Sequence, residues 1–407
     1  MPGTHRATIH DTRDGPSSRC VIFPLDIVTS QSSTLAPLGG ISPIAFMTRY
    51  WQRRAHLVRD AVPDFNDLVT LPELRRIAGR DDVEARVVVR EGTRWHLEHG
   101  PFSPRFWRTL PASRWTLLVQ GLNHTVPAAD ALLQRFAFIP YARLDDVMVS
   151  YAAPGGGVGP HVDSYDVFLL QGHGLRQWRI STQRDQELDP RAPLKILRDF
   201  RPRHTWTLAT GDMLYLPPHV AHDGVALEAC TTYSIGFRAP RYADLIAELF
   251  AEPALARVGD ALYRDPGQRP TRHPAAIPPA ITAGLADAIR RLRFSRRTLD
   301  DLVGGTLSTP KANIVFDRPA PAMPKHRVHA RMRSRGVRLD VRSLMLYHAG
   351  TFYINGERLR PVASARATLR ALADERALLG WRIDPTANDH LYDWYRAGWL
   401  HLANPSI

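Results

Sequence analysis

The sequence predicts a mainly β domain of the jelly-roll type, followed by a helical segment and a smaller α+β unit. Between Val83 and Arg238, short apolar stretches recur at short intervals with turn residues between them. Such spacing favours a sandwich or jelly roll over a sheet whose strands alternate with helices. After Pro240 the apolar pattern becomes helical, and a strong hairpin signal follows at Asn355-Gly356.

Length and composition indicate a globular protein of two or three domains. The chain has 407 residues, more than one ordinary core accommodates, and 44% of them are hydrophobic. Cys20 and Cys230 are the only cysteines, which excludes a disulfide framework and fits a reducing compartment. No apolar run has the length of a membrane span, and the first residues lack the continuous apolar stretch of a secretion signal. We therefore expect a cytoplasmic protein with no membrane partner.

The formal net charge of +13 raises the question of nucleic-acid binding. Nearly all of the positive charge comes from arginine, because the chain has only three lysines, Lys195, Lys311 and Lys325. Arginine spread along a whole chain can also arise from GC-rich coding, without any binding face. We therefore do not expect direct nucleic-acid binding.

The N-terminal region is expected to contain an extension and one short helix. Residues 1–37 mix Ser, Thr, Pro and charged residues without sustained periodicity, which predicts a poorly ordered extension. Ser42 and Pro43 then supply an N-cap and a favoured first-turn residue. We expect Ile44, Met47 and Trp51 to form the apolar stripe of this helix.

Eight strands and one helix are the clearest elements of the β domain. Strands are expected at 86–90, 115–119, 147–151, 167–171, 177–180, 205–208, 213–216 and 231–237, and an inserted helix at 128–136. A jelly-roll barrel can hold a metal in its mouth, where side chains from facing strands converge.

The last part of the chain is expected to be helical, with one hairpin. Helices are predicted at 242–250, 281–294, 364–373 and 390–397, with a proline-rich linker at 266–279. The Asn355-Gly356 pair, within 351–359, fits a type I′ turn between two strands. Helices combined with such a hairpin indicate a winged-helix fold.

His161 and Asp163 are the strongest functional signal, at the end of the run Gly155-Gly-Gly-Val-Gly-Pro160-His161-Val-Asp163. On a β-strand, residues i and i+2 point to the same face, so both side chains are expected to reach one metal ion. The segment Pro217-Pro218-His219-Val-Ala-His222 offers a third ligand from another strand, with two histidines as alternatives. Two imidazoles and one carboxylate leave coordination positions open, as in non-haem Fe(II) oxygenases.

The segment from Leu144 to Gly174 carries a family resemblance. It contains Asp145-Asp146, the glycine-rich turn, His161-Val-Asp163-Ser-Tyr-Asp-Val-Phe168 and Gln171-Gly-His-Gly174. In these motifs the chain resembles the bacterial JmjC-type ribosomal oxygenases, which are cupin-like arginine hydroxylases of a large-subunit ribosomal protein. Further matches are Leu38-Gly-Gly-Ile-Ser-Pro43, Tyr50-Trp51-Gln52, Asp81-Asp-Val-Glu-Ala-Arg86, Gly211-Asp-Met-Leu-Tyr-Leu-Pro-Pro218 and Tyr233-Ser-Ile-Gly-Phe-Arg238. The resemblance extends from about Leu38 to the end and weakens after Pro240.

The resemblance implies a domain organisation. It implies a JmjC, double-stranded β-helix catalytic domain at 38–240, a helical homodimerisation region at 241–312 and a winged-helix-like domain at 313–407. Arginines at 331, 333, 335, 338 and 342 would favour DNA binding by the last domain. Because the resemblance does not imply DNA binding, we expect a structural or protein-docking wing.

The resemblance also implies Fe(II) as the metal, with 2-oxoglutarate and dioxygen as cosubstrates. Its second cupin motif places the third metal ligand at His222, whereas His219 stands where the family often has glycine. Arg176 matches the residue that holds the far carboxylate of 2-oxoglutarate, a task suited to the planar guanidinium. Arg179 is the alternative cation, although it lies off the same strand face. Ser150 is expected to donate a second hydrogen bond, and Ala152 stands where a family member can carry serine.

Substrate contacts are implied more loosely. The resemblance favours Asp145, with Asp146 beside it, as the partner of a substrate arginine, and it matches Ser234 to another substrate contact. Ser164 or Tyr165, next to Asp163, is expected to flank the pocket.

The expected function is Fe(II)- and 2-oxoglutarate-dependent hydroxylation of an arginine in ribosomal protein sixteen of the large subunit. The alternatives with the same iron chemistry are hydroxylation of a ribosomal histidine and demethylation of N-methyl-lysine. From another class, the alternative is a non-catalytic cupin regulator whose wing binds nucleic acid. Intact metal ligands and Arg176 favour the enzyme, since a binding module needs neither.

Overall fold

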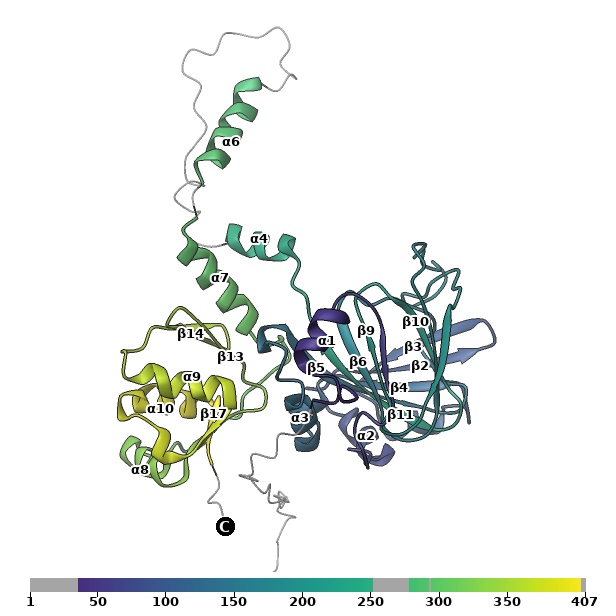
Figure 1. Cartoon of the computed structure of the whole chain (residues 1–407), viewed down its shortest axis with the longest axis horizontal. Coiled ribbons are helices and arrows are strands. Elements are labelled where there is room, and N and C mark those ends of the chain that lie inside the picture. Colours follow the sequence, from purple (N-terminus) through teal and green to yellow (C-terminus); the bar gives the residue numbers. More distant parts are fainter. Residues whose placement is uncertain (1–35, 252–277, 293, 404–407) are drawn as a thin grey trace, which may run out of the picture.

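The computed structural model describes residues 36–251, 278–292 and 294–403, and it shows a two-sheet β domain joined through helices to a smaller C-terminal unit (Figure 1). The predicted extension lies outside the described residues except for its last two positions. Residues 266–277 of the predicted proline-rich linker also lie outside the described residues.

Two antiparallel sheets form the β domain, which confirms the prediction of a jelly roll. The larger sheet has the strand order β1-β9-β6-β11-β5-β4-β2-β3, and the smaller sheet has the order β10-β7-β8. The strands are β1 (His56–Val58), β2 (Ala85–Glu91), β3 (Arg94–His99), β4 (Trp115–Val119), β5 (Leu144–Ala152), β6 (Asp166–Gln171), β7 (Arg176–Ser181), β8 (His204–Leu208), β9 (Met213–Leu216), β10 (Ala221–Ala226) and β11 (Cys230–Phe237). All eight predicted strands are present.

Helices cover the larger sheet on its outer face. They are α1 (Pro43–Arg49), α2 (Leu71–Ile77) and α3 (Pro127–Gln134), with short 3₁₀ turns η1 (Phe106–Arg108), η2 (Leu122–His124) and η3 (Tyr141–Arg143). The alternation along β5 shows how this layering arises. Val147 and Val149 are fully buried in the core beneath these helices, whereas Met148 and Ser150 line a cavity between the sheets.

The prediction for α1 was wrong in detail. Ser42 caps the helix as expected, accepting a hydrogen bond from the amide of Ala45. However, the helix ends at Arg49, and its buried residue is Phe46, while Ile44 is 80% exposed. The expected stripe assumed a helix that continues through Trp51. Trp51 instead follows the helix, although it packs partly buried against the core, as Met47 does.

The helical segment and the C-terminal unit follow. The helices are α4 (Tyr242–Ala251), α6 (Pro279–Arg291), α7 (Arg296–Ser308), α8 (Lys325–Arg335), α9 (Ala365–Glu375) and α10 (Asn388–Ala397), with 3₁₀ turns η5 (Gly380–Arg382) and η6 (Pro385–Ala387). The strands are β12 (Val337–Leu339), β13 (Met345–His348), β14 (Thr351–Ile354), β15 (Glu357–Leu359), β16 (Ala377–Leu378) and β17 (Leu400–Leu402). The predicted hairpin is confirmed, since Asn355 and Gly356 join β14 to β15 with positive φ values of 50° and 89°.

A second core holds the C-terminal unit together, separate from the core of the β domain. It is built from α8, α9, α10 and the short strands around them, with Met332, Leu369 and Leu391 fully buried. Within the described residues, no helix is long and apolar enough to cross a membrane.

Candidate metal centre and its cavity

His161 and His222 are held side by side by their own backbones. The amide of each residue donates to the carbonyl oxygen of the other at 2.9 Å, which forms an isolated antiparallel bridge. Asp163 lies in the loop between β5 and β6, and its carbonyl accepts from the amide of His219 at 2.8 Å. The expectation that His161 and Asp163 lie on one regular strand was therefore wrong. A bridge and a loop bring the two side chains together instead.

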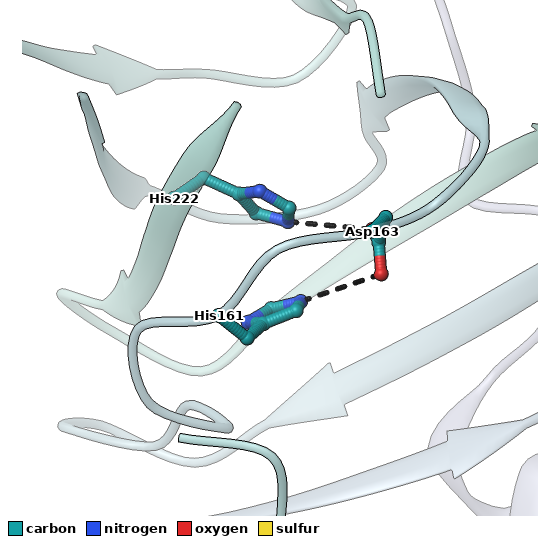
Figure 2. A group of neighbouring side chains, drawn as sticks. All are labelled: His161, Asp163 and His222. Carbon is teal, nitrogen blue, oxygen red and sulfur yellow. Dashed lines mark ion pairs between the residues drawn. The ribbon is translucent and has the colours of Figure 1, made fainter. Parts of the chain in front are cut away.

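The three side chains converge on one point (Figure 2). The distance from His161 Nε2 to Asp163 Oδ1 is 4.0 Å, and that from His222 Nε2 to Asp163 Oδ2 is 3.5 Å. Metal–ligand bonds of roughly 2.1 Å allow two ligand atoms of one ion to lie up to about 4.2 Å apart. The donor set therefore fits a single metal ion.

Both imidazoles direct their Nε2 atoms towards the position of the metal. The Nδ1 atoms of His161 and His222 lie 2.9 Å from the carbonyl oxygens of Gly159 and Val220, respectively. A carbonyl can only accept, so Nδ1 carries the proton and Nε2 keeps its lone pair for a metal. Burial lowers the pKa of His222 to about 4, with His161 adding to the effect, so this imidazole is neutral at pH 7.

The structure distinguishes between His219 and His222, the two alternatives for the third metal ligand. His222 is 2% exposed and belongs to the cluster. His219 is exposed, lies outside the cluster and has a φ of 64°. A positive φ of this kind favours glycine, the residue expected there from the family resemblance.

A cavity of about 370 Å³ opens between the two sheets beside the cluster. Arg176 reaches into it from β7 and is 4% exposed. Its Nη1 donates to Ser150 Oγ at 3.0 Å, but its Nε and Nη2 have no hydrogen-bond partner. Arg179 lies on the opposite face of β7 from Arg176. It pairs with Asp223 and does not line the cavity. A buried guanidinium with two unpaired donor atoms fits an anion bound beside it.

The predicted substrate residues divide into two groups. Tyr165 and Ser234 line the cavity, whereas Ser164 is exposed and does not. Asp145 and Asp146 do not line it either, because both carboxylates bind Lys311 Nζ, at 2.8 and 3.0 Å. Burial raises the pKa of the Tyr165 hydroxyl, and the nearby Asp163 carboxylate raises it further, so the hydroxyl stays protonated.

Sequence reasoning missed several residues of the cavity. Met148 lines it two positions before Ser150, which strand alternation would have revealed. Arg86, within a motif already noted, lines it from β2, and Lys195 lines it from the loop between β7 and β8. No local pattern marked Lys195 or Lys311, because each comes from a segment without periodicity.

Family models match both described domains. A JmjC domain model matches residues 131–245, and a ROXA-like winged-helix model matches residues 291–401. A model of the AraC-like ligand-binding domain, which covers residues 201–307, overlaps the end of the first match. The winged-helix match includes α7, which the predicted boundary at 313 left in the helical region.

Named relatives resemble the chain over half or more of its length. Ribosomal protein uL16 3-hydroxylase of Escherichia coli K12 is 33% identical over 337 residues, which are 81% of this chain and 90% of the relative. A probable ribosomal oxygenase of Haemophilus influenzae is 36% identical over 51% of this chain and 52% of its own length. The solved structure of E. coli YcfD superimposes with a TM-score of 0.79 at 30% identity, covering 89% of this chain and 98% of that one.

The jelly roll, the two-histidine, one-carboxylate cluster and the attached winged helix define a cupin-fold oxygenase of the JmjC class. Within that class, the chain belongs to the bacterial JmjC ribosomal oxygenases. The predicted family, fold class and winged helix are thereby confirmed.

The cofactor prediction is confirmed for the family. Structures of the E. coli oxygenase YcfD hold cobalt with 2-oxoglutarate, at a TM-score of 0.76, and cobalt with succinic acid. The residues of this chain fit the same groups. Three donor atoms converge for a metal, and Arg176 has two unpaired buried donors for a dicarboxylate.

Proposed function

We propose that this protein is an Fe(II)- and 2-oxoglutarate-dependent hydroxylase of a ribosomal protein, with an arginine of the large-subunit protein uL16 as its target. The observation that carries the proposal is Arg176, whose buried Nε and Nη2 lack partners in the same cavity as the cluster of His161, Asp163 and His222. A metal site alone would not require that guanidinium.

Different side chains would bind the metal and the cosubstrate. His161, Asp163 and His222 would hold the iron on one face and leave positions open on the other. Arg176, with Ser150 fixing its guanidinium, would bind the far carboxylate of 2-oxoglutarate. Iron, 2-oxoglutarate and dioxygen together supply the oxidation that turns a C–H bond into C–OH, with release of succinate and carbon dioxide.

The substrate protein and the target residue rest on different supports. The E. coli relative is named for hydroxylation of uL16, which supports the substrate protein. The choice of arginine rests on the family resemblance, and Tyr165 and Ser234 would form a polar, partly aromatic wall for its side chain beside the cluster. Asp145 and Asp146 remain proposed partners of the substrate guanidinium, on the condition that Lys311 releases them. An arginine side chain suits this exchange, because its charge replaces that of the lysine.

The test uses purified protein with Fe(II), 2-oxoglutarate and a uL16 peptide, and measures succinate and peptide mass. We expect one added oxygen on an arginine and little reaction when lysine replaces that arginine. Hydroxylation of a histidine peptide in preference to the arginine peptide would contradict the target. Absence of 2-oxoglutarate turnover with every peptide would contradict the enzyme class.

One alternative has support of its own. A relative from Dictyostelium discoideum, named as a bifunctional lysine-specific demethylase and histidyl-hydroxylase, is 38% identical over 84 residues, which are 19% of this chain. The short coverage makes it a weaker guide than the uL16 hydroxylase. A purely regulatory cupin is disfavoured, because a binding module has no use for the buried unpaired guanidinium.

We also propose that the protein forms a homodimer through α6. Figure 1 shows α6 projecting away from the β domain and the C-terminal unit. Its residues Ile281, Leu285 and Ile289, four apart on one face, are 41%, 61% and 55% exposed. Such an apolar stripe requires a partner, and a second copy supplies an identical stripe.

Light scattering after size exclusion tests the dimer. Leu285→Glu should give a monomer, whereas Ala283→Glu, on the opposite face of α6, should remain dimeric. A wild-type monomer, or equal behaviour of the two variants, would contradict the proposal.

A further inference from the structure

Helix α8 carries a dense set of exposed cations, of which Lys325 pairs with Asp389 at 2.9 Å. From Lys325 to Leu339 the sequence has six Lys or Arg residues and no Asp or Glu. Val328 and Met332 are buried against the C-terminal core, and Arg327, Arg331, Arg333 and Arg335 are exposed. Among the described residues, none of these four guanidinium groups makes an ion pair or hydrogen bond.

The spacing of these arginines is not repeated on any other helix of the described residues. Some exposed arginines elsewhere pair with a carboxylate near them in sequence, as in Arg80–Asp82, Arg191–Asp189 and Arg201–Asp199. Others, such as Arg94, Arg184 and Arg318, are exposed and make no ion pair, so the lack of a partner alone does not distinguish α8. Only α8, among the described helices, carries three such arginines at i, i+4 and i+8.

The charges on α8 also act against the stability of the helix itself. Arg327 stands in the first turn, where the helix dipole is positive and an unpaired cation is unfavourable, whereas Lys325 in the same turn pairs with Asp389. Arg327, Arg331 and Arg335 follow at i, i+4 and i+8, and like charges at this spacing repel each other. The helix dipole can account for Arg333 and Arg335 in the last turn, but not for Arg327.

We propose that the row formed by Arg327, Arg331 and Arg335 on α8 binds the phosphate backbone of RNA. The row places a guanidinium about every 6 Å along one side of the helix, and phosphates would remove the repulsion within it. The choice of RNA rests on the proposed function, since a ribosomal protein is assembled with RNA. Composition alone did not favour nucleic-acid binding, and the placement of these residues changes that expectation.

The position of α8 leaves the catalytic cavity free. The helix packs on α10, η5 and β17 within the C-terminal unit, and none of its residues lines the cavity. Figure 1 shows it at the edge of that unit, away from the β domain. RNA bound there would hold the enzyme near its substrate protein without closing the pocket.

The test is fluorescence anisotropy of a labelled single-stranded RNA at several KCl concentrations, using the full chain. Three phosphate contacts give a slope of roughly −2 in log affinity against log salt. The variant R327Q/R331Q/R335Q should bind the RNA at least about ten-fold more weakly. The control R80Q/R191Q/R201Q removes the same total charge from paired arginines and should bind within about two-fold of wild type.

Thermal unfolding and peptide hydroxylation accompany the binding assay. The α8 variant should melt no lower than wild type, because repulsion is removed, and it should hydroxylate a free peptide at the wild-type rate. If the triple variant fails to fold, Arg331→Gln alone should still weaken RNA binding more than Arg191→Gln. Normal hydroxylation without RNA binding would overturn this inference and leave the proposed function intact.

Three other results would overturn the inference. They are equal weakening by the two triple variants, tighter binding to duplex DNA of the same length, and binding to phosphatidylserine vesicles in place of RNA.

Discussion

Arg176 has the surroundings of a guanidinium whose partner is a bound anion. It is 4% exposed and lines the cavity, its Nη1 is fixed by Ser150, and its Nε and Nη2 are buried without partners. Leaving charged donors unpaired in a protein interior is costly, so a cosubstrate carboxylate at this position would offset that cost.

Arg176→Ala should therefore raise the concentration of 2-oxoglutarate needed for half-maximal turnover by roughly ten- to a hundred-fold, which corresponds to about 1.5–3 kcal/mol. Metal affinity, measured by titration with cobalt, should stay the same. Arg179→Ala is the matched control, because Arg179 pairs with Asp223 outside the cavity. A larger effect from Arg179→Ala would show that the anion binds elsewhere.

Most of the cluster was predictable from sequence, because its signals are local. His161 and Asp163 are two residues apart, and the motif register distinguished His222 from His219. The partner of Asp145 and Asp146 was not predictable, since Lys311 is 165 residues from Asp146 along the chain. Only the tertiary fold brings that ammonium to the start of β5.

At the scale of elements, the glycine-rich turn between β5 and β6 packs backbone against backbone. A Cβ at Gly157 would lie 2.6 Å from the carbonyl oxygen of Gly224 on β10, the strand that carries His222. Neither backbone can move without shifting the histidines, so glycine is required there by close approach.

Gly157→Ala should lower the free energy of unfolding by about 1–3 kcal/mol and weaken cobalt binding, as measured by melting and titration. Gly284→Ala in α6 is the control, because, apart from the neighbouring residues and backbone of its own helix, no described atom lies within 4 Å of the added methyl group. It should be neutral or slightly stabilising. Equal cobalt affinity in the Gly157 variant and wild type would contradict the packing argument.

The predictions of elements were right where the sequence shows strong strand alternation or a clear turn motif. They missed helices whose sequences show no apolar stripe at helical spacing. The β domain strands and the Asn355-Gly356 hairpin carry clear signals. Helix α8 has just two buried apolar residues among many charged ones, so no helical stripe was visible in the sequence. Helix α7 is held by contacts with α4 and the β13–β15 hairpins, which sequence periodicity does not report.

At the scale of the whole molecule, the C-terminal unit depends on a buried carboxylate. Asp340 is 4% exposed and accepts from Arg342 Nε and His401 Nε2, each at 2.7 Å. Burial alone would raise the pKa of Asp340, but the hydrogen bonds from Arg342 and His401 outweigh it and hold the pKa well below its usual range.

A carboxyl group with a depressed folded-state pKa stabilises the fold above its unfolded pKa. That stability is lost as the pH falls from about 4 towards the folded-state value. Asp340→Asn should therefore lower the melting temperature at pH 7, by an amount equivalent to at least about 2 kcal/mol. The difference from wild type should shrink as the pH is lowered from 5 to 3. A constant difference over that range would contradict the assignment.

We propose that the cavity between the sheets binds an arginine of uL16 for hydroxylation. The most direct test is the mass of uL16 peptides from cells that carry the gene, lack it, or carry it as His222→Ala or His219→Ala. We predict one added oxygen on a single arginine-containing peptide with the wild-type and His219→Ala proteins. The peptide should be unmodified without the gene and with His222→Ala. A uL16 of the same mass in all four strains would contradict the account.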